Sequence, residues 1–579
     1  MAMVRTCQLS TDFEKGILTW EEYPRPQMRR DSYISLCGEW ELYCHKGEFG
    51  TPDRNEEKLG NIIVPYPPES RISGIERQIG KDENCIYRKK FILPDNFNKG
   101  IILLNFGAVD QICRVNVNGK HIGAHIGGYL PFDFDITNAV TEGENVLEVE
   151  VMDKLDKELP YGKQSEKRGG MWYTPISGIW QAVWLESVPQ NYIKSLRITP
   201  TLDSVTVEVV SPAKEFEIAV HTPNGDLVKQ FSGDRVTVEI PDGVLWTPEN
   251  PYLYEFTLTS ENDSVESYFG LRTVTIENRG ERKYICLNGK PYFFHGLLDQ
   301  GYFSDGIYTP ASPEGYLFDI RETKKLGFNM LRKHIKIEPD LFYYYCDKLG
   351  MIVFQDMVNS GGYNFLVDTA LPTIGLRKGI RHKASKRQKT RFEKCAKGTV
   401  DTLYNHPCVC YYTIFNEGWG QFDADGMYKA LKQYDPTRIW DATSGWFTEK
   451  ESDVQSEHIY FRPVKLKATD RPLVLSEFGG YSFKVDGHSF NLDKNYGYKT
   501  FDSAEKLTEG LEKLYLDEIV PAVENGLCAA VLTQVSDVED ETNGLFTYDR
   551  RVTKVDGKVM VSVAEKLKEV FDKAADNVL

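Results

Sequence analysis

Hydrophobic and polar residues alternate along the first part of the chain with the period of β-strands. From Trp40 to about Glu186 the alternating segments are short, and no helical period interrupts them. Asn118-Gly119 and Glu142-Gly143-Glu144 separate neighbouring segments, and Asn-Gly is a strong signal of a tight hairpin. We therefore expect residues 1–188 to form an antiparallel β-sandwich, with strands at 101–106, 112–117, 146–152 and 180–186.

A second alternating unit follows at residues 189–277. Its strand-like segments lie at 205–210, 215–220, 236–240 and 253–259. Two prolines, Pro248 and Pro251, interrupt them, because proline cannot donate to a strand ladder. A segment of this length and pattern fits a small immunoglobulin-like β-sandwich.

The period changes after Asn288-Gly289-Lys290, where apolar strand-like runs begin to alternate with helical stretches. Helical patterns cover 313–326, 338–349, 385–405, 423–434, 503–525 and 562–574. Eight candidate strands lie at 292–298, 330–334, 351–356, 409–416, 439–443, 458–461, 473–478 and 527–534. Near-continuous apolar strands between helices indicate a parallel sheet, and eight repeats predict a (β/α)8 TIM barrel over residues 278–579.

Composition narrows the class of partner. The 579 residues exceed what one hydrophobic core can hold, so several domains are expected. A net charge of -16 would repel a phosphate backbone, which argues against nucleic acid. No segment reaches the ~20 apolar residues of a membrane span, and residues 1–16 lack the apolar core of a secretory signal. These observations favour a cytoplasmic protein without a membrane partner.

The cysteines and the basic residues point to no further ligand. The 11 cysteines are scattered, odd in number and without the spacing of a disulfide framework, so we expect free thiols. Cys408 and Cys410 would point to opposite sides of a strand and cannot form a zinc half-site. We assign no metal and no cofactor. The basic cluster from Arg377 to Lys394 could bind an anion, but a solvated helix face is favoured.

Two carboxylates stand where catalytic groups of such a barrel are expected, at the carboxyl ends of its strands. The fourth apolar run ends in Asn416-Glu417, and the seventh ends in Ser476-Glu477. Two carboxyl groups facing across a cleft are what glycoside hydrolysis requires, and a separation of about 5 to 5.5 Å gives retention of configuration. Either glutamate alone would be explained as a strand-end cap or a salt-bridge partner.

Motifs along nearly the whole chain make it similar to glycoside hydrolase family 2, which includes β-galactosidases, β-glucuronidases and β-mannosidases. In the first domain, the segments that resemble the family's sugar-binding jelly-roll are 116–120, 128–133 and 178–181. In the barrel, residues 288–291, 332–334, 416–417 and 476–480 resemble its motifs. The resemblance implies that Glu417 is the acid/base, that Glu477 is the nucleophile, and that Asn416 binds the 2-hydroxyl of the sugar.

Further polar and aromatic residues end strands at the same mouth. Tyr460 is expected to donate to Glu477, with a packed aromatic as the alternative, and Arg332 to support Glu477. His334 could bind a sugar hydroxyl or be a satisfied core histidine. Asp299 and Gln300 follow the first strand and are expected to hold the terminal sugar on an aromatic platform. Trp419 and Trp446 are candidates for that platform, with core packing as the alternative for either.

Three departures from the family bear on the substrate. The third strand reads Phe354-Gln355-Asp356-Met357-Val358-Asn359, whereas magnesium-dependent β-galactosidases have a Glu and a His there, so no essential magnesium is predicted. Glu541-Thr542-Asn543 stands where β-glucuronidases have Asn-x-Lys, and an acid there should repel a uronate. The eighth strand ends in Thr533-Gln534 without the family's tryptophan, which places Gln534 at an altered pocket.

These features together predict a retaining exo-glycosidase for a terminal neutral β-linked sugar, with galactose as the commonest option. β-Glucuronidase, β-glucosidase, β-mannosidase and α-L-arabinopyranosidase activities stay open, as does a homo-oligomeric state. A non-catalytic carbohydrate-binding protein is the alternative from another class, and the presence of both glutamates argues against it.

Overall fold

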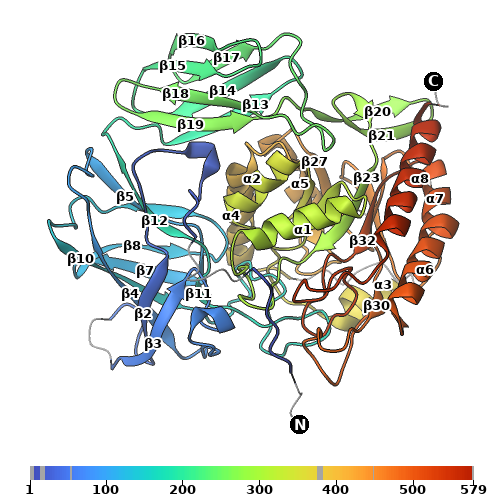
Figure 1. Cartoon of the computed structure of the whole chain (residues 1–579), viewed down its shortest axis with the longest axis horizontal. Coiled ribbons are helices and arrows are strands. Elements are labelled where there is room, and N and C mark those ends of the chain that lie inside the picture. Colours follow the sequence, from blue (N-terminus) through green and yellow to red (C-terminus); the bar gives the residue numbers. More distant parts are fainter. Residues whose placement is uncertain are drawn as a thin grey trace.

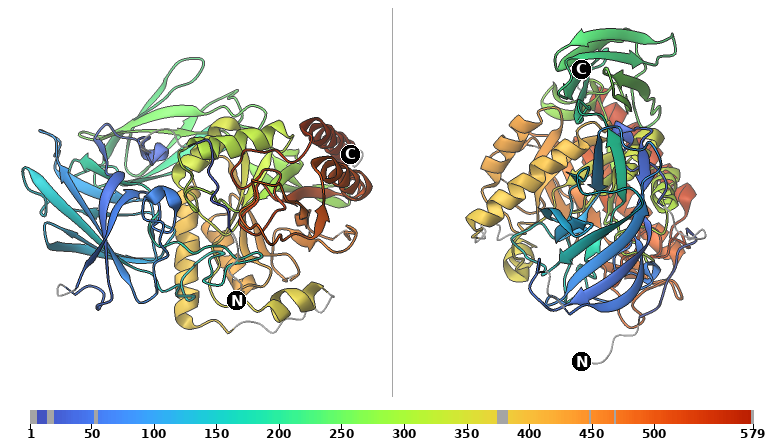
Figure 2. Two further views of the ribbon diagram at one scale, coloured as in Figure 1. Left: turned by 60° about the horizontal axis from the view of Figure 1, so that its bottom comes forward. Right: turned by 90° about the vertical axis from the view of Figure 1, so that its left-hand side faces the viewer.

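A computed structural model describes residues 6–13, 20–51, 55–373, 383–447, 449–467 and 469–576. The chain forms a β-sandwich, a second and smaller sandwich, and a barrel surrounded by helices (Figure 1). Figure 2 shows the first sandwich beside the barrel in its left view and in front of the barrel in its right view. Within the described residues, no helix has both the length and the apolar character needed to cross a membrane.

The first domain is the expected antiparallel sandwich. One sheet pairs β1 (Tyr33–Ser35), β12 (Val183–Val188), β5 (Ile101–Phe106) and β9 (Phe132–Asp135) in that order. The other pairs β3 (Glu57–Val64), β2 (Gly38–His45), β4 (Asn84–Ile92), β10 (Glu144–Met152), β7 (Ile112–Val117) and β8 (Lys120–Ile126). Apolar side chains such as Trp40, Leu104 and Val149 fill the space between the sheets.

The predicted Asn-Gly hairpin joins β7 to β8. Asn118 and Gly119 both have positive φ, at 52° and 75°, as a type I′ turn requires. A short ribbon of β6 (Val109–Asp110) and β11 (Gly178–Ile179), with the turns η1 (Pro26–Met28) and η2 (Arg71–Ser73), completes the domain.

The second domain is the expected immunoglobulin-like sandwich. Its three-stranded sheet contains β13 (Ser195–Pro200), β14 (Ser204–Val210) and β17 (Arg235–Glu239). Its four-stranded sheet contains β16 (Leu227–Ser232), β15 (Glu215–Val220), β18 (Tyr254–Thr259) and β19 (Ser264–Phe269). The inward-facing side chains of Val207, Ile218 and Phe256 alternate with exposed or half-exposed neighbours. The apolar residues of the alternating sequence therefore form the core between the two sheets.

The third domain is a (β/α)8 barrel, and each of its eight parallel strands overlaps a predicted one. Their order is β27, β26, β25, β24, β23, β32, β29, β28. The strands are β23 (Phe294–Asp299), β24 (Met330–Lys333), β25 (Ile352–Asp356), β26 (Val409–Asn416), β27 (Ile439–Ser444), β28 (Gln455–Ile459), β29 (Leu473–Gly479) and β32 (Leu527–Thr533). The end strands β27 and β28 are joined by Ser456 Oγ, which donates to the Thr443 carbonyl over 3.1 Å.

Helices cover the barrel at the predicted places. They are α1 (Glu314–Lys325), α2 (Asp340–Leu349), α3 (Leu371–Thr373), α4 (Lys386–Leu403), α5 (Ala424–Tyr434), α6 (Ala504–Leu514), α7 (Val520–Glu524) and α8 (Gly557–Asp576). π-helical turns occur at η3 (Leu366–Ala370) and η4 (Tyr515–Ile519). The single helix expected at 503–525 is therefore divided, because Pro521 lacks the N–H of a regular helix.

Smaller elements complete the third domain. The antiparallel strands β20 (Val274–Arg279), β21 (Arg282–Leu287) and β22 (Lys290–Pro291) precede the barrel, and Tyr284 and Leu287 pack into its core. The ribbon of β30 (Tyr481–Phe483) and β31 (Lys499–Phe501) follows β29. All 11 cysteines are free thiols, as their scattered spacing predicted.

Candidate active site

Glu417 and Glu477 lie at the same end of the barrel, although 59 residues separate them in the sequence. Glu417 directly follows β26, and Glu477 is near the end of β29. The backbone of Glu417 is left-handed, with φ at +53°, a conformation that costs an ordinary residue roughly 1 to 2 kcal/mol. Its N–H donates to the Ser444 carbonyl over 2.8 Å, which holds this bend against the next strand.

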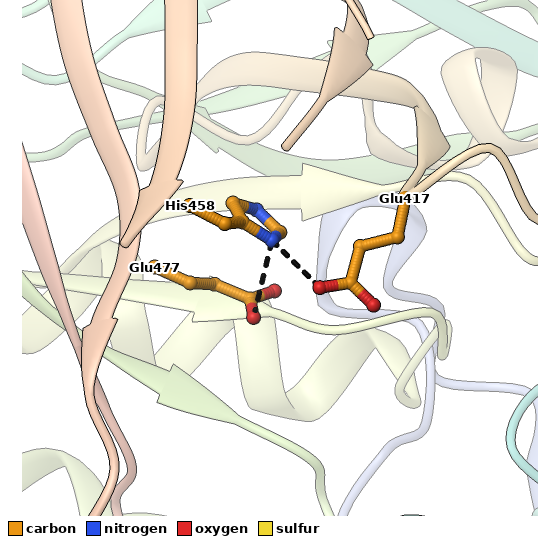
Figure 3. A group of neighbouring side chains, drawn as sticks. All are labelled: Glu417, His458 and Glu477. Carbon is orange, nitrogen blue, oxygen red and sulfur yellow. Dashed lines mark hydrogen bonds and ion pairs between the residues drawn. The ribbon is translucent and has the colours of Figure 1, made fainter. Parts of the chain in front are cut away.

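His458 brings the two carboxylates together. Its Nδ1 lies 2.9 Å from Glu417 Oε1 and 3.5 Å from Glu477 Oε2 (Figure 3). These three side chains each offer an atom within 4.8 Å of the others, so the two carboxylates are no farther apart than that at their nearest oxygens. A limit of 4.8 Å between the nearest oxygens is compatible with the close arrangement of carboxyl groups in retaining enzymes.

Glu477 is buried and surrounded by donors. Arg332 Nη1 donates to its Oε1 over 3.0 Å, and Tyr460 Oη donates to its Oε2 over 2.6 Å. Burial alone would raise the pKa of Glu477, but the charges of His458 and Arg332 outweigh burial and lower it to about 2. Glu477 is therefore ionised at neutral pH, as an attacking carboxylate must be.

Arg332 also fixes the neighbouring side chains. Its Nε donates to Asp356 Oδ1 and its Nη2 donates to Asn416 Oδ1, each over 3.0 Å. Asp356 Oδ2 in turn lies 2.6 Å from His334 Nδ1. Since burial lowers the pKa of His334 to about 4, its neutral ring places the proton on Nδ1 and leaves Nε2 as an acceptor.

The structure separates the two candidate platform residues. Trp446 lies edge-on to His458, 6.0 Å between ring centres, and lines a small cavity with Tyr460 and Phe461. Trp419 is only 2% exposed, and its Nε1 donates to Tyr161 Oη over 3.2 Å. Trp419 is thus packed between the sandwich and the barrel, where it cannot offer an open face, and its expectation as a platform is corrected.

Asp299 does not join this group as expected. The carboxylate of Asp299 pairs with Lys333 over 2.7 Å, and Lys333 packs over the ring of Phe342 in α2. Successive residues of a strand point to opposite sides, so Arg332 reaches into the barrel while Lys333, with Asp299, faces the helices. Gln300, the next residue, is buried, and its contact with the sugar stays a prediction.

Gln534 contacts a second acidic centre at the mouth. Its Nε2 donates to Glu541 Oε2 over 3.0 Å and to Asn543 Oδ1 over 2.7 Å. Tyr173, from the sandwich, donates its hydroxyl to Glu541 as well. Burial raises the pKa of Glu541. The segment that lacks the uronate-binding lysine thus places a buried, hydrogen-bonded carboxyl group at Glu541, and the lysine position itself is the uncharged Asn543.

His458 was missing from the residues predicted for the site. The signal was present, because His458 lies two residues before Tyr460 near the end of one strand, and residues at this spacing share a face. Donor atoms of Glu417, His458 and Glu477 could also surround a metal ion. The absence of an essential metal remains a prediction.

Comparison with known proteins agrees with this architecture. Models of the family Glycosyl hydrolases family 2 match residues 36–189 (sugar binding domain), 191–272 and 279–480 (TIM barrel domain). A β-galactosidase of Priestia megaterium is 23% identical over 607 aligned positions, covering 92% of this chain and 55% of that protein. A β-glucuronidase of Felis catus is 25% identical, covering 72% of this chain and 69% of that protein.

The solved structures share the fold. A β-glucuronidase from an uncultured Clostridium superposes with a TM-score of 0.71 at 20% identity, over 96% of this chain and 100% of that one. The chain spans about half the length of several bacterial β-galactosidases that it matches, between 45% and 55%. Since models of one family match all three domains in order, the chain belongs to glycosyl hydrolase family 2.

Proposed function

We propose that this chain is a retaining exo-β-glycosidase in which Glu477 is the nucleophile and Glu417 the acid/base. The observation that carries the proposal is the close pair of carboxylates, of which Glu477 is kept ionised by Arg332, Tyr460 and His458. A pair joined only as strand-end caps would not need three donors focused on one member.

The reaction would proceed in two displacements. Glu477 attacks the anomeric carbon while Glu417 gives its proton to the departing oxygen, which leaves a glycosyl ester on Glu477. Glu417 then removes a proton from water, which attacks the same carbon and releases Glu477. Asn416, held by Arg332, lies beside Glu477 and is assigned to the 2-hydroxyl of the sugar.

A neutral sugar fits the charges at the mouth better than a uronate. The uncharged Asn543 stands where the resemblance places the lysine, Glu541 adds a carboxyl group two residues before it, and Arg550 is committed to Asp319 by two bonds of 3.1 and 3.0 Å. In the described part of the basic cluster, Arg387 and Arg391 pair with Glu158 and Asp156 of the sandwich. Leaving a buried carboxylate unpaired costs several kcal/mol, so a β-galactoside is the substrate we name first.

The catalytic roles are tested with nitrophenyl glycosides. We expect Glu477→Ala to abolish turnover, and Glu417→Ala to retain cleavage of activated aryl glycosides with slow deglycosylation. Azide should restore the rate of the Glu417→Ala protein and give a β-glycosyl azide. Glu505→Ala, which removes an exposed carboxylate of α6, is the control. Wild-type kinetics of the Glu477→Ala protein would refute the assignment.

The sugar is tested with the wild-type protein. We expect kcat/KM for nitrophenyl β-D-galactoside to exceed that for the β-D-glucuronide by on the order of a thousandfold, since several kcal/mol at ~1.4 kcal/mol per decade separate the two. Equal or faster hydrolysis of the glucuronide would replace the neutral-sugar proposal by a uronidase.

A further inference from the structure

A segment of the sandwich domain lies across the barrel mouth. It connects β10 to β11 and is teal in Figure 1. The N–H of Tyr161 donates to the Asn359 carbonyl over 2.9 Å, and its hydroxyl donates to the Gly361 carbonyl over 2.8 Å. The same hydroxyl accepts from Trp419, two residues beyond Glu417. The segment is thereby attached beside the strand that carries the proposed acid/base.

The next residue, Gly162, packs closely against the end of another strand. Gly162 has φ at +69°, and a methyl group there would lie 2.7 Å from Tyr129 Oη and 3.3 Å from the Ile335 carbonyl oxygen. Ile335 directly follows His334. Only a glycine fits in this contact. The contact fixes the backbone just before Lys163 next to the end of β24.

The segment is attached a third time through Tyr173. The carbonyl of Lys163 accepts from the N–H of Tyr173 over 3.1 Å, and the hydroxyl of Tyr173 donates to Glu541. The backbone around Lys163 is therefore attached both to the strand ends that carry Glu417 and His334 and to the loop that carries Glu541.

The ammonium group of Lys163 acts on the residues of the mouth without being bound to one of them. Burial raises the pKa of Glu477, and the charge of Lys163 helps to lower it, although less than His458 and Arg332 do. Burial also raises the pKa of Glu541, and the charge of Lys163 lowers it. Yet among the carboxylates that the structure describes, none lies within 4.0 Å of it. The side chain is half-buried, so a ligand can reach it.

We propose that Lys163 of the sandwich domain and Glu541 of the barrel together bind hydroxyl groups of the terminal sugar and set its preference. This rests on the proposed function. An ammonium group only donates and a carboxylate only accepts, whereas a sugar hydroxyl does both, so the pair can hold one hydroxyl or two neighbouring ones between them. The charges of Lys163 and Glu541 compensate each other, which leaves no net attraction for a uronate.

The hydroxyls concerned lie away from the reacting carbon. Glu477 and Asn416 are assigned to the anomeric carbon and the 2-hydroxyl, whereas Glu541 is reached through Gln534, beyond the end of β32. The pair is therefore assigned to the hydroxyls at C3, C4 or C6.

The test crosses variants of Lys163 with deoxy sugars. Lys163→Met keeps the length of the side chain and removes its charge, and Lys167→Met, at an exposed position of the same segment, is the control. The substrates are nitrophenyl β-D-galactoside, its 3-deoxy and 4-deoxy analogues, and the β-D-fucoside, which lacks the 6-hydroxyl. Calorimetric binding of free galactose is measured in parallel, and Lys163→Gln replaces the methionine variant if that protein does not fold.

We expect Lys163→Met to lower kcat/KM for the galactoside about ten- to hundredfold, as the loss of a charged hydrogen bond predicts. The loss should shrink to about twofold for the analogue that lacks the bound hydroxyl, while Lys167→Met stays within twofold of wild type throughout. An equal loss on every sugar, no loss, or a loss confined to uronides would overturn the proposal.

The two proposals fail in different ways. If wild type cleaves no glycoside but binds galactose, and Lys163→Met weakens that binding, the proposed function fails and the role of Lys163 stands. If wild type cleaves the galactoside and Lys163→Met cleaves it equally well, the role of Lys163 fails alone.

Discussion

One imidazole nitrogen contacts both proposed catalytic carboxylates. His458 Nδ1 faces Glu417 and Glu477, while its Nε2 lies 3.0 Å from Ser444 Oγ. The ring is thus oriented from behind and presents one nitrogen to the site. A positive charge there favours the ionised form of Glu477, which counteracts the burial of that carboxylate.

Replacing His458 should therefore change the pH dependence of the reaction. In His458→Asn the pKa of Glu477 rises from about 2, so the nucleophile protonates at higher pH. We expect kcat/KM of wild type to stay level on the acid side until the protein unfolds, and that of the variant to fall at a pH well above this limit. An unchanged acid limb in the pH profile would show that Arg332 alone keeps Glu477 ionised.

Metal ions should inhibit rather than support the enzyme. Both oxygens of Asp356 are engaged, by Arg332 over 3.0 Å and by His334 over 2.6 Å, so this third-strand carboxylate is not available to hold magnesium. We expect dialysis against EDTA to leave kcat unchanged. Added Zn²⁺ should inhibit competitively, because Glu417, His458 and Glu477 offer donor atoms within 4.8 Å of one another. Lost activity that magnesium restores would contradict this prediction.

At the level of elements, a buried ion pair joins helix α2 to the turn between α4 and β26. His406 Nδ1 lies 2.6 Å from Asp347 Oδ2, and Tyr268 of the immunoglobulin-like domain donates to the same oxygen over 2.8 Å. Burial alone would lower the pKa of His406, but Asp347 and Asp340 outweigh it and raise the pKa to about 9.

This pair should make the protein less stable in alkali. The folded-state pKa of His406 lies above the unfolded value of about 6.5, so the contribution is complete below pH ~6.5 and is lost as the pH rises through about 9. It amounts to about 3 kcal/mol. We expect the Tm of wild type to fall over this range. His406→Gln should lower the Tm at pH 6.5 and flatten the dependence, whereas His221→Gln, at an exposed site, should do neither.

At the level of the whole molecule, the sandwich and the barrel share a buried aromatic cluster. Tyr129, Tyr161, Tyr173 and Trp180 of the sandwich pack with Trp419 and other barrel residues. The ring of Trp419 lies edge-on to Trp172, with 4.8 Å between ring centres. The domain interface therefore begins two residues from Glu417, so that docking of the domains and shaping of the site depend on the same side chains.

Truncating Trp419 should weaken both the docking of the two domains and the activity of the site. Loss of a buried tryptophan costs about 3 to 5 kcal/mol, and here it falls between two domains. We expect Trp419→Ala to lower the Tm, to separate the calorimetric unfolding of sandwich and barrel, and to reduce kcat/KM at least tenfold. Phe365→Ala removes a ring that is 65% exposed and should leave the Tm nearly unchanged. Full activity of a destabilised Trp419→Ala protein would show that the site does not depend on this contact.

The sequence alone determined the domain types, the eight barrel strands and the two strand-end glutamates. Periods of two and 3.6 residues state which side of an element is buried, and the carboxyl ends of parallel strands meet at one rim, so local pattern sufficed. The same local logic could have found His458, which shares a strand face with Tyr460.

Only the tertiary structure decided which polar groups reach the site. Asp299 and Trp419 lie at strand ends, as the residues of the site do. Asp299, however, pairs with Lys333 on the side of α2, and Trp419 donates to Tyr161 in the domain interface. Lys163 and Tyr173 reach the barrel from a different domain, and no periodicity relates them to Glu541. Such contacts depend on how separately folded units dock, and that information is spread over the surfaces of both units rather than carried by any one segment of the chain.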